Sequence, residues 1–348
     1  MIYPDFIGEG CTVAVTAPSD GNSKPIDYIR LDKAKHNLEQ RGVSVIETPN
    51  VRTSIKGRSS AGEVRASEFM DVWKDDSISA VFAAKGGDFL MEMLSYLDFE
   101  TIAKSPKWFQ GYSDNTGLTF TITTLCDIAS VYCNNFNDFA MKNWHLSVDN
   151  NWDLLCGKEV LQNGYDRYQS DFYDGTTGDE GYVLTTNTHC CCINRFEEPS
   201  ATACVNESAV NMKGRLLGGC LDVLLNLVGT KYDNVKHFVE KYKNDKIIWY
   251  MESFSLSSES VERGLWQLAE AGWFDNVAGF IFGRPAFFES FTDTSFDEAV
   301  INGVGSFGVP IITGADIGHR PPQFTMINGV MCEFSLDGGQ AHIKYDFV

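Results

Sequence analysis

The sequence predicts an α/β protein with two domains. The first is an N-terminal doubly wound parallel sheet of the Rossmann or flavodoxin type, and the second is a smaller C-terminal α/β domain with a β tail. The chain has 348 residues, which is more than a single core usually serves. Apolar strand patterns alternate with amphipathic helix patterns from the N-terminus to residue 135, and a similar alternation returns near the C-terminus. Such alternation is typical of a parallel sheet covered by helices on both faces.

The N-terminal domain is predicted at residues 1–165 and opens on the apolar strand "CTVAVTAP". The following helix, 27–42, carries Tyr28, Leu31 and Leu38 on one face and ends at a glycine. The other predicted strands of this domain are 43–49, 78–87, 108–113 and 130–135. The predicted helices between them are 61–76, 88–98 and 115–126.

Between Asn134 and Met212 the alternation is lost, and Trp, Tyr, Asp, Asn and Thr dominate. A long stretch of weak regularity is typical of a linker with functional loops. We therefore predict a linker and substrate loops at residues 166–212. The aromatic side chains of the whole stretch 134–212 have two explanations that the sequence leaves open, which are stacking on a base and packing under a loop.

The C-terminal domain is predicted at residues 213–348. Order resumes at Gly214, and one helix face is formed by Leu221, Leu224, Leu225 and Val228. Beyond it, strands alternate with helices, and the predicted strands are 246–253, 277–285 and 309–319, with helices at 260–274 and 295–308. The chain ends on two alternating runs separated by "DGG", which predict a β-hairpin.

The net charge is strongly negative, because 28 Lys and Arg residues stand against 47 Asp and Glu residues, giving −19. A surface of this sign repels phosphate backbones and anionic lipid, so neither nucleic acid nor a membrane is an expected partner. The longest apolar runs are far shorter than the ~20 residues of a membrane span, and no secretory signal is visible. We therefore expect a cytoplasmic protein whose ten cysteines are reduced thiols.

Three of the cysteines, Cys190, Cys191 and Cys192, are adjacent. Neighbouring side chains of an extended chain point in opposite directions, which is a poor geometry for a metal cage, and the sequence has no C-x-x-C pair. The sequence therefore predicts neither a metal site nor a cofactor.

Polar residues of catalytic type follow the predicted strands, at the edge of the sheet where ligands of open α/β folds bind. They are Gly86-Gly87, Ser113, Glu252 and His319. A serine hydroxyl needs a histidine to take its proton, and a carboxylate fixes the tautomer of that histidine and stabilises the imidazolium. These three residue types at three strand ends are those that a nucleophilic hydrolase requires.

Each candidate also has a structural explanation. Ser113 can be an ordinary strand–turn–helix joint, Glu252 can cap a helix, and His319 can be an inert loop residue. The serine also departs from the G-x-S-x-G elbow, because Asn115 stands where the second glycine is expected, although Asn tolerates tight backbone geometry.

The glycine pair in "KGGDF" is not part of a phosphate-binding P-loop, whose spacing it lacks. A glycine pair at a strand end suits a backbone N–H aimed at an oxyanion better. The N–H of Asp114, directly after the serine, would be its partner.

The segment "KGGDFLMEMLSYLDFETIAKSPKWFQGYSDNTGLTF" resembles the signature of the LD-carboxypeptidase family of serine peptidases. "GRLLGGCLDVLLNLVGTKYD", "IIWYMES" and "GADIGHRPP" resemble its later segments, in the same order. The resemblance implies that Ser113 is the nucleophile, His319 the general base and Glu252 its orienting carboxylate. It also implies oxyanion N–H groups from Gly87 and Asp114, an active site between the two domains, and a homodimer.

The family divides into muropeptide LD-carboxypeptidases and enzymes similar to the microcin C self-immunity peptidase, which cut an amide joining a peptide or amino acid to a nucleotide-like group. The long aromatic segment between the domains favours the second group, and a muropeptide L,D-carboxypeptidase of peptidoglycan recycling is the alternative. A non-catalytic small-ligand binding protein is a second alternative. The departures from the family pattern, "TMINGV", "GGDF", Asn115 and Gly117, leave the triad intact and bear on the choice of substrate.

Overall fold

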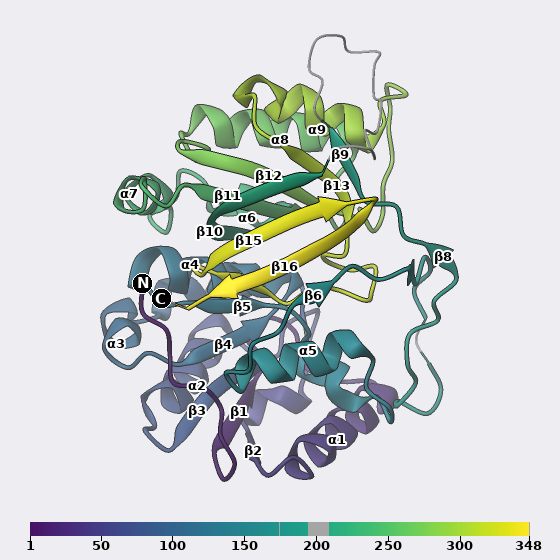
Figure 1. Cartoon of the computed structure of the whole chain (residues 1–348). Coiled ribbons are helices and arrows are strands. Elements are labelled where there is room, and N and C mark those ends of the chain that lie inside the picture. Colours follow the sequence, from purple (N-terminus) through teal and green to yellow (C-terminus); the bar gives the residue numbers. More distant parts are fainter. Residues whose placement is uncertain (174, 194–208, 348) are drawn as a thin grey trace. The chain divides into compact units, whose positions relative to one another are not determined.

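The computed structural model describes residues 1–173, 175–193 and 209–347, and it confirms the predicted α/β class (Figure 1). The chain forms two compact units. Unit 1 consists of Met1–Val160, Phe172–Val183 and Thr325–Asn328. Unit 2 consists of Leu161–Asp171, Leu184–Phe324 and Gly329–Val348.

The sheet of unit 1 has six strands in the order β14-β5-β4-β3-β1-β2. Their bounds are β1 Thr12–Thr16, β2 Ser44–Glu47, β3 Ile78–Ala83, β4 Trp108–Gly111, β5 Ser130–Tyr132 and β14 Met326–Asn328. β1 to β5 pair in parallel, and β14 adds an antiparallel edge. The parallel order 2-1-3-4-5 is that of flavodoxin-like folds, in which ligands bind at the switch point between β1 and β3.

Five α-helices accompany this sheet in the described part of unit 1: α1 Pro25–Glu39, α2 Gly62–Lys74, α3 Phe99–Lys104, α4 Thr116–Cys126 and α5 Leu146–Leu155. Four 3₁₀ segments join them: η1 Pro49–Arg52, η2 Leu90–Tyr96, η3 Ser113–Asn115 and η4 Phe136–Ala140. The helix predicted at 88–98 is the 3₁₀ helix η2 in the structure.

Helix α5 lies in the stretch that the sequence indicated to be irregular. Its buried face includes Asn150 and Asn151, so the apolar periodicity of a core-facing helix is broken. Asn151 is satisfied by a reciprocal amide pair with Gln110 of β4, with N···O distances of 2.8 and 3.0 Å. Because a buried amide pair stands where apolar side chains are expected, the hydrophobic pattern of the sequence does not indicate this helix.

The sheet of unit 2 has eight strands in the order β6-β16-β15-β10-β11-β12-β13-β9. Their bounds are β6 Gln162–Asn163, β9 Cys191–Ile193, β10 Val210–Cys220, β11 Ile247–Glu252, β12 Val277–Gly283, β13 Ile311–Ala315, β15 Met331–Asp337 and β16 Gln340–Asp346. β10 to β13 are parallel, and the hairpin β15–β16 was predicted correctly. A separate pair is formed by β7 Arg167–Tyr168 and β8 Thr186–Asn187.

The helices of unit 2 are α6 Leu221–Leu227, α7 Val235–Lys241, α8 Ser258–Glu270 and α9 Phe296–Val304, followed by η5 Gly305–Phe307. The predicted helix face at Leu221 belongs to α6, but the strand β10 before it was not predicted. Glycine is uncommon inside strands, so the glycines of β10 kept the sequence pattern from indicating a strand. A Cβ at Gly218 would lie 1.7 Å from the carbonyl oxygen of Tyr250, so only glycine lets β10 pair closely with β11 here.

The cysteines correct one expectation. Eight of those in the described residues are free thiols, but Cys191 is disulfide-bonded. The prediction of ten reduced thiols is therefore wrong at Cys191, because folding decides which sulfur atoms meet and sequence spacing does not show it. None of the helices in the described ranges is long and apolar enough to cross a membrane.

Candidate active site

Ser113 lies on a sharp turn between β4 and α4, and its φ of +65° is in the left-handed region. A residue with a Cβ pays a steric cost there, so the surrounding contacts must hold it. The N–H of Ser113 donates to the hydroxyl of buried Tyr132 at 3.2 Å, and its carbonyl accepts from Thr116 Oγ1 at 2.7 Å. A sharp left-handed turn between a strand and a helix is the backbone conformation that a nucleophile elbow uses.

Asn115 explains the departure from the glycine of the usual elbow. Its φ of −63° and ψ of −7° are helical, so this position does not require glycine. The buried Asn115 amide donates to the carbonyl oxygens of Lys85 at 3.0 Å and Tyr112 at 3.1 Å. The asparagine thereby ties the loop after β3 to the elbow.

Glycines surround the elbow because neighbouring backbone approaches it closely. A Cβ at Gly111 would lie 2.9 Å from the Cβ atoms of both Ala83 and Asn115. A Cβ at Gly86 would lie 3.0 Å from Ser113 Cβ and 3.1 Å from Ser113 Oγ. The predicted glycine pair therefore packs directly beside the predicted nucleophile.

Two backbone donors accompany the serine in unit 1. Within the described part of the chain, the N–H groups of Gly87 and Asp114 have no hydrogen-bond acceptor. The Asp114 side chain is buried and accepts from Ser19 Oγ and from the Leu90 N–H, the latter at 2.8 Å. Burial raises the pKa of the Asp114 carboxyl, and the hydrogen bond from Ser19 opposes that rise.

The predicted base and its carboxylate meet in unit 2. Glu252 is the last residue of β11, and its side chain is fully buried. His319 Nδ1 lies 2.9 Å from Glu252 Oε2. A carboxylate only accepts hydrogen bonds, so Nδ1 carries the proton and Nε2 is the basic nitrogen. The ring of Phe254, with its centroid 4.6 Å from that of His319, packs on the imidazole.

Two glycines make room for the Glu252 carboxylate. Gly318 has φ +94°, and a Cβ there would lie 2.5 Å from Glu252 Oε2. A Cβ at Gly283 would lie 2.3 Å from the carbonyl oxygen of Ile317 and 3.0 Å from Glu252 Cβ. The loop of His319 therefore runs in contact with the carboxylate, and only glycine permits this approach.

A buried ion pair that the sequence analysis missed holds the same loop. Arg284 Nη1 contacts Asp316 Oδ1 at 2.7 Å, with side chains 8% and 2% exposed. Arg284 Nη2 donates to the carbonyl of Arg320 at 2.9 Å, while Asp316 Oδ2 accepts from the N–H of Tyr165 at 2.9 Å. Arg284 lies within the strand predicted at 277–285, so nothing in the local sequence pattern marked it as part of a site.

The predicted residues thus form two groups. Ser113, Gly87 and Asp114 belong to unit 1, whereas Glu252 and His319 belong to unit 2. The first group offers a hydroxyl beside two backbone donors, and the second offers an imidazole whose tautomer is fixed.

Burial raises the pKa of the Cys133 and Cys190 thiols to about 12, so neither supplies a competing thiolate nucleophile. No cluster of three or more His, Cys, Asp or Glu side chains suited to a metal ion occurs among residues 1–173, 175–193 and 209–347.

Curated relatives span nearly the whole chain. A Bacillus subtilis protein named "Putative carboxypeptidase YocD" is 25% identical over 99% of each chain. The "Microcin C7 self-immunity protein MccF" of Escherichia coli is 23% identical over 89% of this chain and 87% of its own. The "Probable murein peptide carboxypeptidase" of Bacillus subtilis is 23% identical over 93% of this chain and 88% of its own.

Solved structures show the same fold. An MccF-like protein from Bacillus anthracis matches with a TM-score of 0.79 and 20% identity over 99% of each chain. The microcin C7 self-immunity protein MccF in complex with aspartyl sulfamoyl adenosine matches with a TM-score of 0.79 and 18% identity over 100% of each chain. Two family profiles, described as the LD-carboxypeptidase N-terminal and C-terminal domains, match residues 13–133 and 213–334. The chain therefore belongs to the LD-carboxypeptidase family and is a serine-type hydrolase.

Proposed function

We propose that this enzyme hydrolyses an amide bond in a small peptide-like substrate, with Ser113 as nucleophile, His319 as general base and Glu252 as the carboxylate that orients it. The observation that carries the proposal is the left-handed backbone of Ser113, φ +65°, on a turn bordered by close-packed glycines. The 2.9 Å contact between His319 Nδ1 and Glu252 Oε2 supports it.

The proposed reaction has two steps. Ser113 Oγ attacks the amide carbonyl carbon while His319 Nε2 takes the hydroxyl proton, and the N–H groups of Gly87 and Asp114 stabilise the oxyanion. The C–N bond then breaks, His319 gives the proton to the leaving amine, and an acyl ester remains on the serine. Water adds to this ester by the same proton transfers and releases the acid.

Replacing Ser113 with Ala tests the proposal. Turnover should fall by several orders of magnitude, because no other group of the site can form the acyl ester. On heating, the variant should still unfold in one cooperative transition. The contacts that hold the left-handed turn also hold a small residue such as alanine in that conformation. Unchanged turnover by the variant would eliminate Ser113 as the nucleophile.

For the substrate, we propose an aminoacyl- or peptidyl-nucleotide amide. A structure with the same fold holds aspartyl sulfamoyl adenosine. In this chain, Tyr173 exposes 53% of its surface, and an exposed aromatic ring is the kind of group on which a base stacks. The Trp residues of the same stretch are less available, because Trp152 is buried and Trp144 packs against it with centroids 6.4 Å apart.

The second candidate substrate is a muropeptide, favoured by the similarity to the murein peptide carboxypeptidase. Separate incubations with an aminoacyl-sulfamoyl adenosine and with a muropeptide tetrapeptide distinguish the two. We expect the first to be cleaved with the higher kcat/KM. Release of a terminal D-amino acid at the higher kcat/KM would establish the muropeptide instead.

The earlier alternative of a non-catalytic binding protein is tested by a serine-reactive fluorophosphonate. Labelling of the wild type that Ser113→Ala abolishes supports catalysis, whereas ligand binding without labelling supports the alternative. A homodimer and a cytoplasmic location remain predictions, which sedimentation and cell fractionation would measure.

A further inference from the structure

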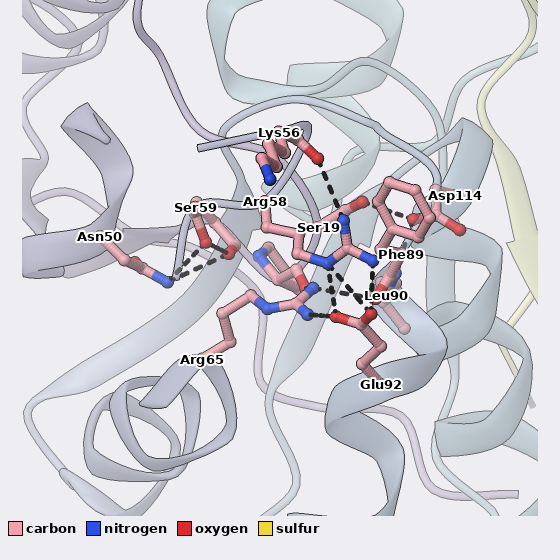
Figure 2. Close-up of polar contacts among 12 residues, drawn as sticks. Ser19, Asn50, Lys56, Arg58, Ser59, Arg65, Phe89, Leu90, Glu92 and Asp114 are labelled. Atoms are coloured by element: carbon pink, nitrogen blue, oxygen red, sulfur yellow. Dashed lines mark hydrogen bonds and ion pairs between the residues drawn. The ribbon is translucent and has the colours of Figure 1, made fainter. Parts of the chain in front are cut away.

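Arg65 of α2, drawn in Figure 2, is an unusual residue for the interior of unit 1. Its side chain is 0% exposed. Its Nη1 donates to the carbonyl oxygens of Pro18 at 2.9 Å and Phe89 at 3.0 Å. Its Nη2 contacts Glu92 Oε2 at 2.6 Å. Burying a cation is costly, and a well-packed apolar residue would serve stability at least as well. The guanidinium therefore needs another explanation, which its two carbonyl partners supply.

Each of those carbonyls immediately precedes a residue that holds Asp114 (Figure 2). Pro18 precedes Ser19, whose hydroxyl donates to Asp114 Oδ2. Phe89 precedes Leu90, whose N–H donates to the same oxygen at 2.8 Å. One guanidinium thus fixes both donors of the Asp114 carboxylate through the adjoining peptide units.

Ser19 also sets the place of Gly87. A Cβ on Gly87 would lie 2.3 Å from Ser19 Oγ, so the two residues are in direct contact. The next residue, Asp20, donates its N–H to the carbonyl of Gly86 at 3.3 Å. Ser19 follows β1 and the glycines follow β3, so this contact lies at the switch point of the sheet.

We propose that Arg65 is a positioning residue for the oxyanion site, acting through Ser19 and Leu90 to set the places of the Gly87 and Asp114 backbone N–H groups. The inference rests on the proposed function, in which these two N–H groups stabilise the oxyanion. Such donors contribute only when they are aimed at the transition-state oxygen, so a loosened loop lowers kcat and leaves substrate binding intact.

Arg58 provides a matched control (Figure 2). It contacts the same carboxylate, with Arg58 Nη2 2.6 Å from Glu92 Oε1, and its guanidinium lies 3.5 Å from the ring centroid of Phe89. Its side chain is 32% exposed, and its backbone partner is the carbonyl of Lys56, outside the segments that hold Asp114. Arg58 therefore touches a segment that holds Asp114 only through the Phe89 ring, and removing it weakens the same ion-pair cluster while the hydrogen bonds from Arg65 to the carbonyls of Pro18 and Phe89 remain.

The experiment compares Arg65→Gln, Ser19→Ala and Arg58→Gln with the wild type. The first readout is the second-order rate constant for labelling of Ser113 by an alkyl fluorophosphonate, in which the serine oxygen bonds to phosphorus and fluoride leaves. The second is kcat and KM on the better of the two substrates above. We expect Arg65→Gln and Ser19→Ala to lower the labelling rate and kcat at least about tenfold, with KM changed less than about threefold. Arg58→Gln should change each quantity less than about threefold.

Arg65 and Ser19 act on one loop assembly. The labelling rate and kcat of the double variant should therefore be little lower than those of the slower single variant. A labelling rate of Arg65→Gln equal to that of the wild type or of Arg58→Gln overturns the inference, as does a raised KM with unchanged kcat. If Arg65→Gln shows no cooperative unfolding, Ser19→Ala decides by the same criteria. A wild type that is not labelled at Ser113 refutes the proposed function and this inference together, whereas a labelled wild type with unaffected variants refutes the inference alone.

Discussion

The contacts around individual residues of this site restrict which side chain can stand at each position, and Asp114 is the clearest case. Its backbone N–H is a proposed oxyanion donor, while its buried carboxyl accepts from Ser19 and Leu90 at one oxygen. An amide oxygen in the same place can accept both bonds. The side chain therefore anchors the loop by its acceptor oxygen, and its negative charge is a cost of burial that the anchor does not require.

We predict that Asp114→Asn raises the free energy of unfolding near neutral pH. Burial raises the folded-state pKa of Asp114 above its unfolded value of about 3.9. Its contribution to stability is therefore complete below the unfolded pKa and is lost as pH rises through the folded pKa. The gain of the Asn variant should vanish near pH 3 and grow toward pH 7. Urea unfolding of both proteins across this range measures it, and a gain that is largest at low pH contradicts the assignment.

Gly318 is the second residue whose identity the geometry dictates. We predict that Gly318→Ala lowers turnover at least about a hundredfold, because the new Cβ would lie 2.5 Å from Glu252 Oε2 and push the carboxylate away from His319. The matched control is Gly308→Ala, where φ is +64° and nothing lies within 4 Å of the new Cβ. The control should lose about 1–2 kcal/mol of stability from the backbone alone and keep its turnover. Equal turnover of the two variants would contradict the steric argument.

At the scale of elements, the turn from β4 to α4 is built by side-chain hydrogen bonds where related elbows use a second glycine. Asn115 supplies them from a helical backbone, and it connects this turn to the loop after β3. The G-x-S-x-G pattern of α/β-hydrolases is therefore not a guide to the most stable residue at this position.

We predict that Asn115→Gly, which restores the G-x-S-x-G pattern, destabilises the protein by about 1–3 kcal/mol. The carbonyls of Lys85 and Tyr112 lose the hydrogen bonds from the Asn115 side chain, and glycine adds backbone entropy to the unfolded chain. Asn115→Ala separates the two effects, since it removes the hydrogen bonds without the flexibility. Chemical denaturation of the three proteins gives the order of stability, and a glycine variant as stable as the wild type would sink the prediction.

At the scale of the whole molecule, the sequence predicted what depends on local pattern. The apolar strands, the amphipathic helices and the polar residues at strand ends are local features, and they placed Glu252 at the end of β11 and Ser113 at the joint after β4. His319 was predicted as the last residue of a strand at 309–319, but β13 ends at Ala315 and His319 lies in the loop beyond it. It missed α5, whose buried face carries paired amides, and β10, whose glycines lack strand propensity. It also missed Arg65 and Arg284, because a buried cation is recognised only by the carbonyls that converge on it from distant segments.

The net charge of −19 carries the last prediction. A net-anionic member of either substrate class, such as aspartyl sulfamoyl adenosine with its side-chain carboxylate, is opposed on approach by a long-range field that salt screens. Raising the ionic strength from about 0.01 M to about 0.15 M shortens the Debye length from ~30 Å to ~8 Å. We therefore expect kcat/KM for such a substrate to rise with salt, whereas the labelling rate of Ser113 by an uncharged fluorophosphonate should stay constant. Steady-state kinetics over a salt series measures both. If kcat/KM falls with salt while labelling stays constant, cationic groups near the bound substrate outweigh the net charge, and the whole-molecule field does not govern substrate capture.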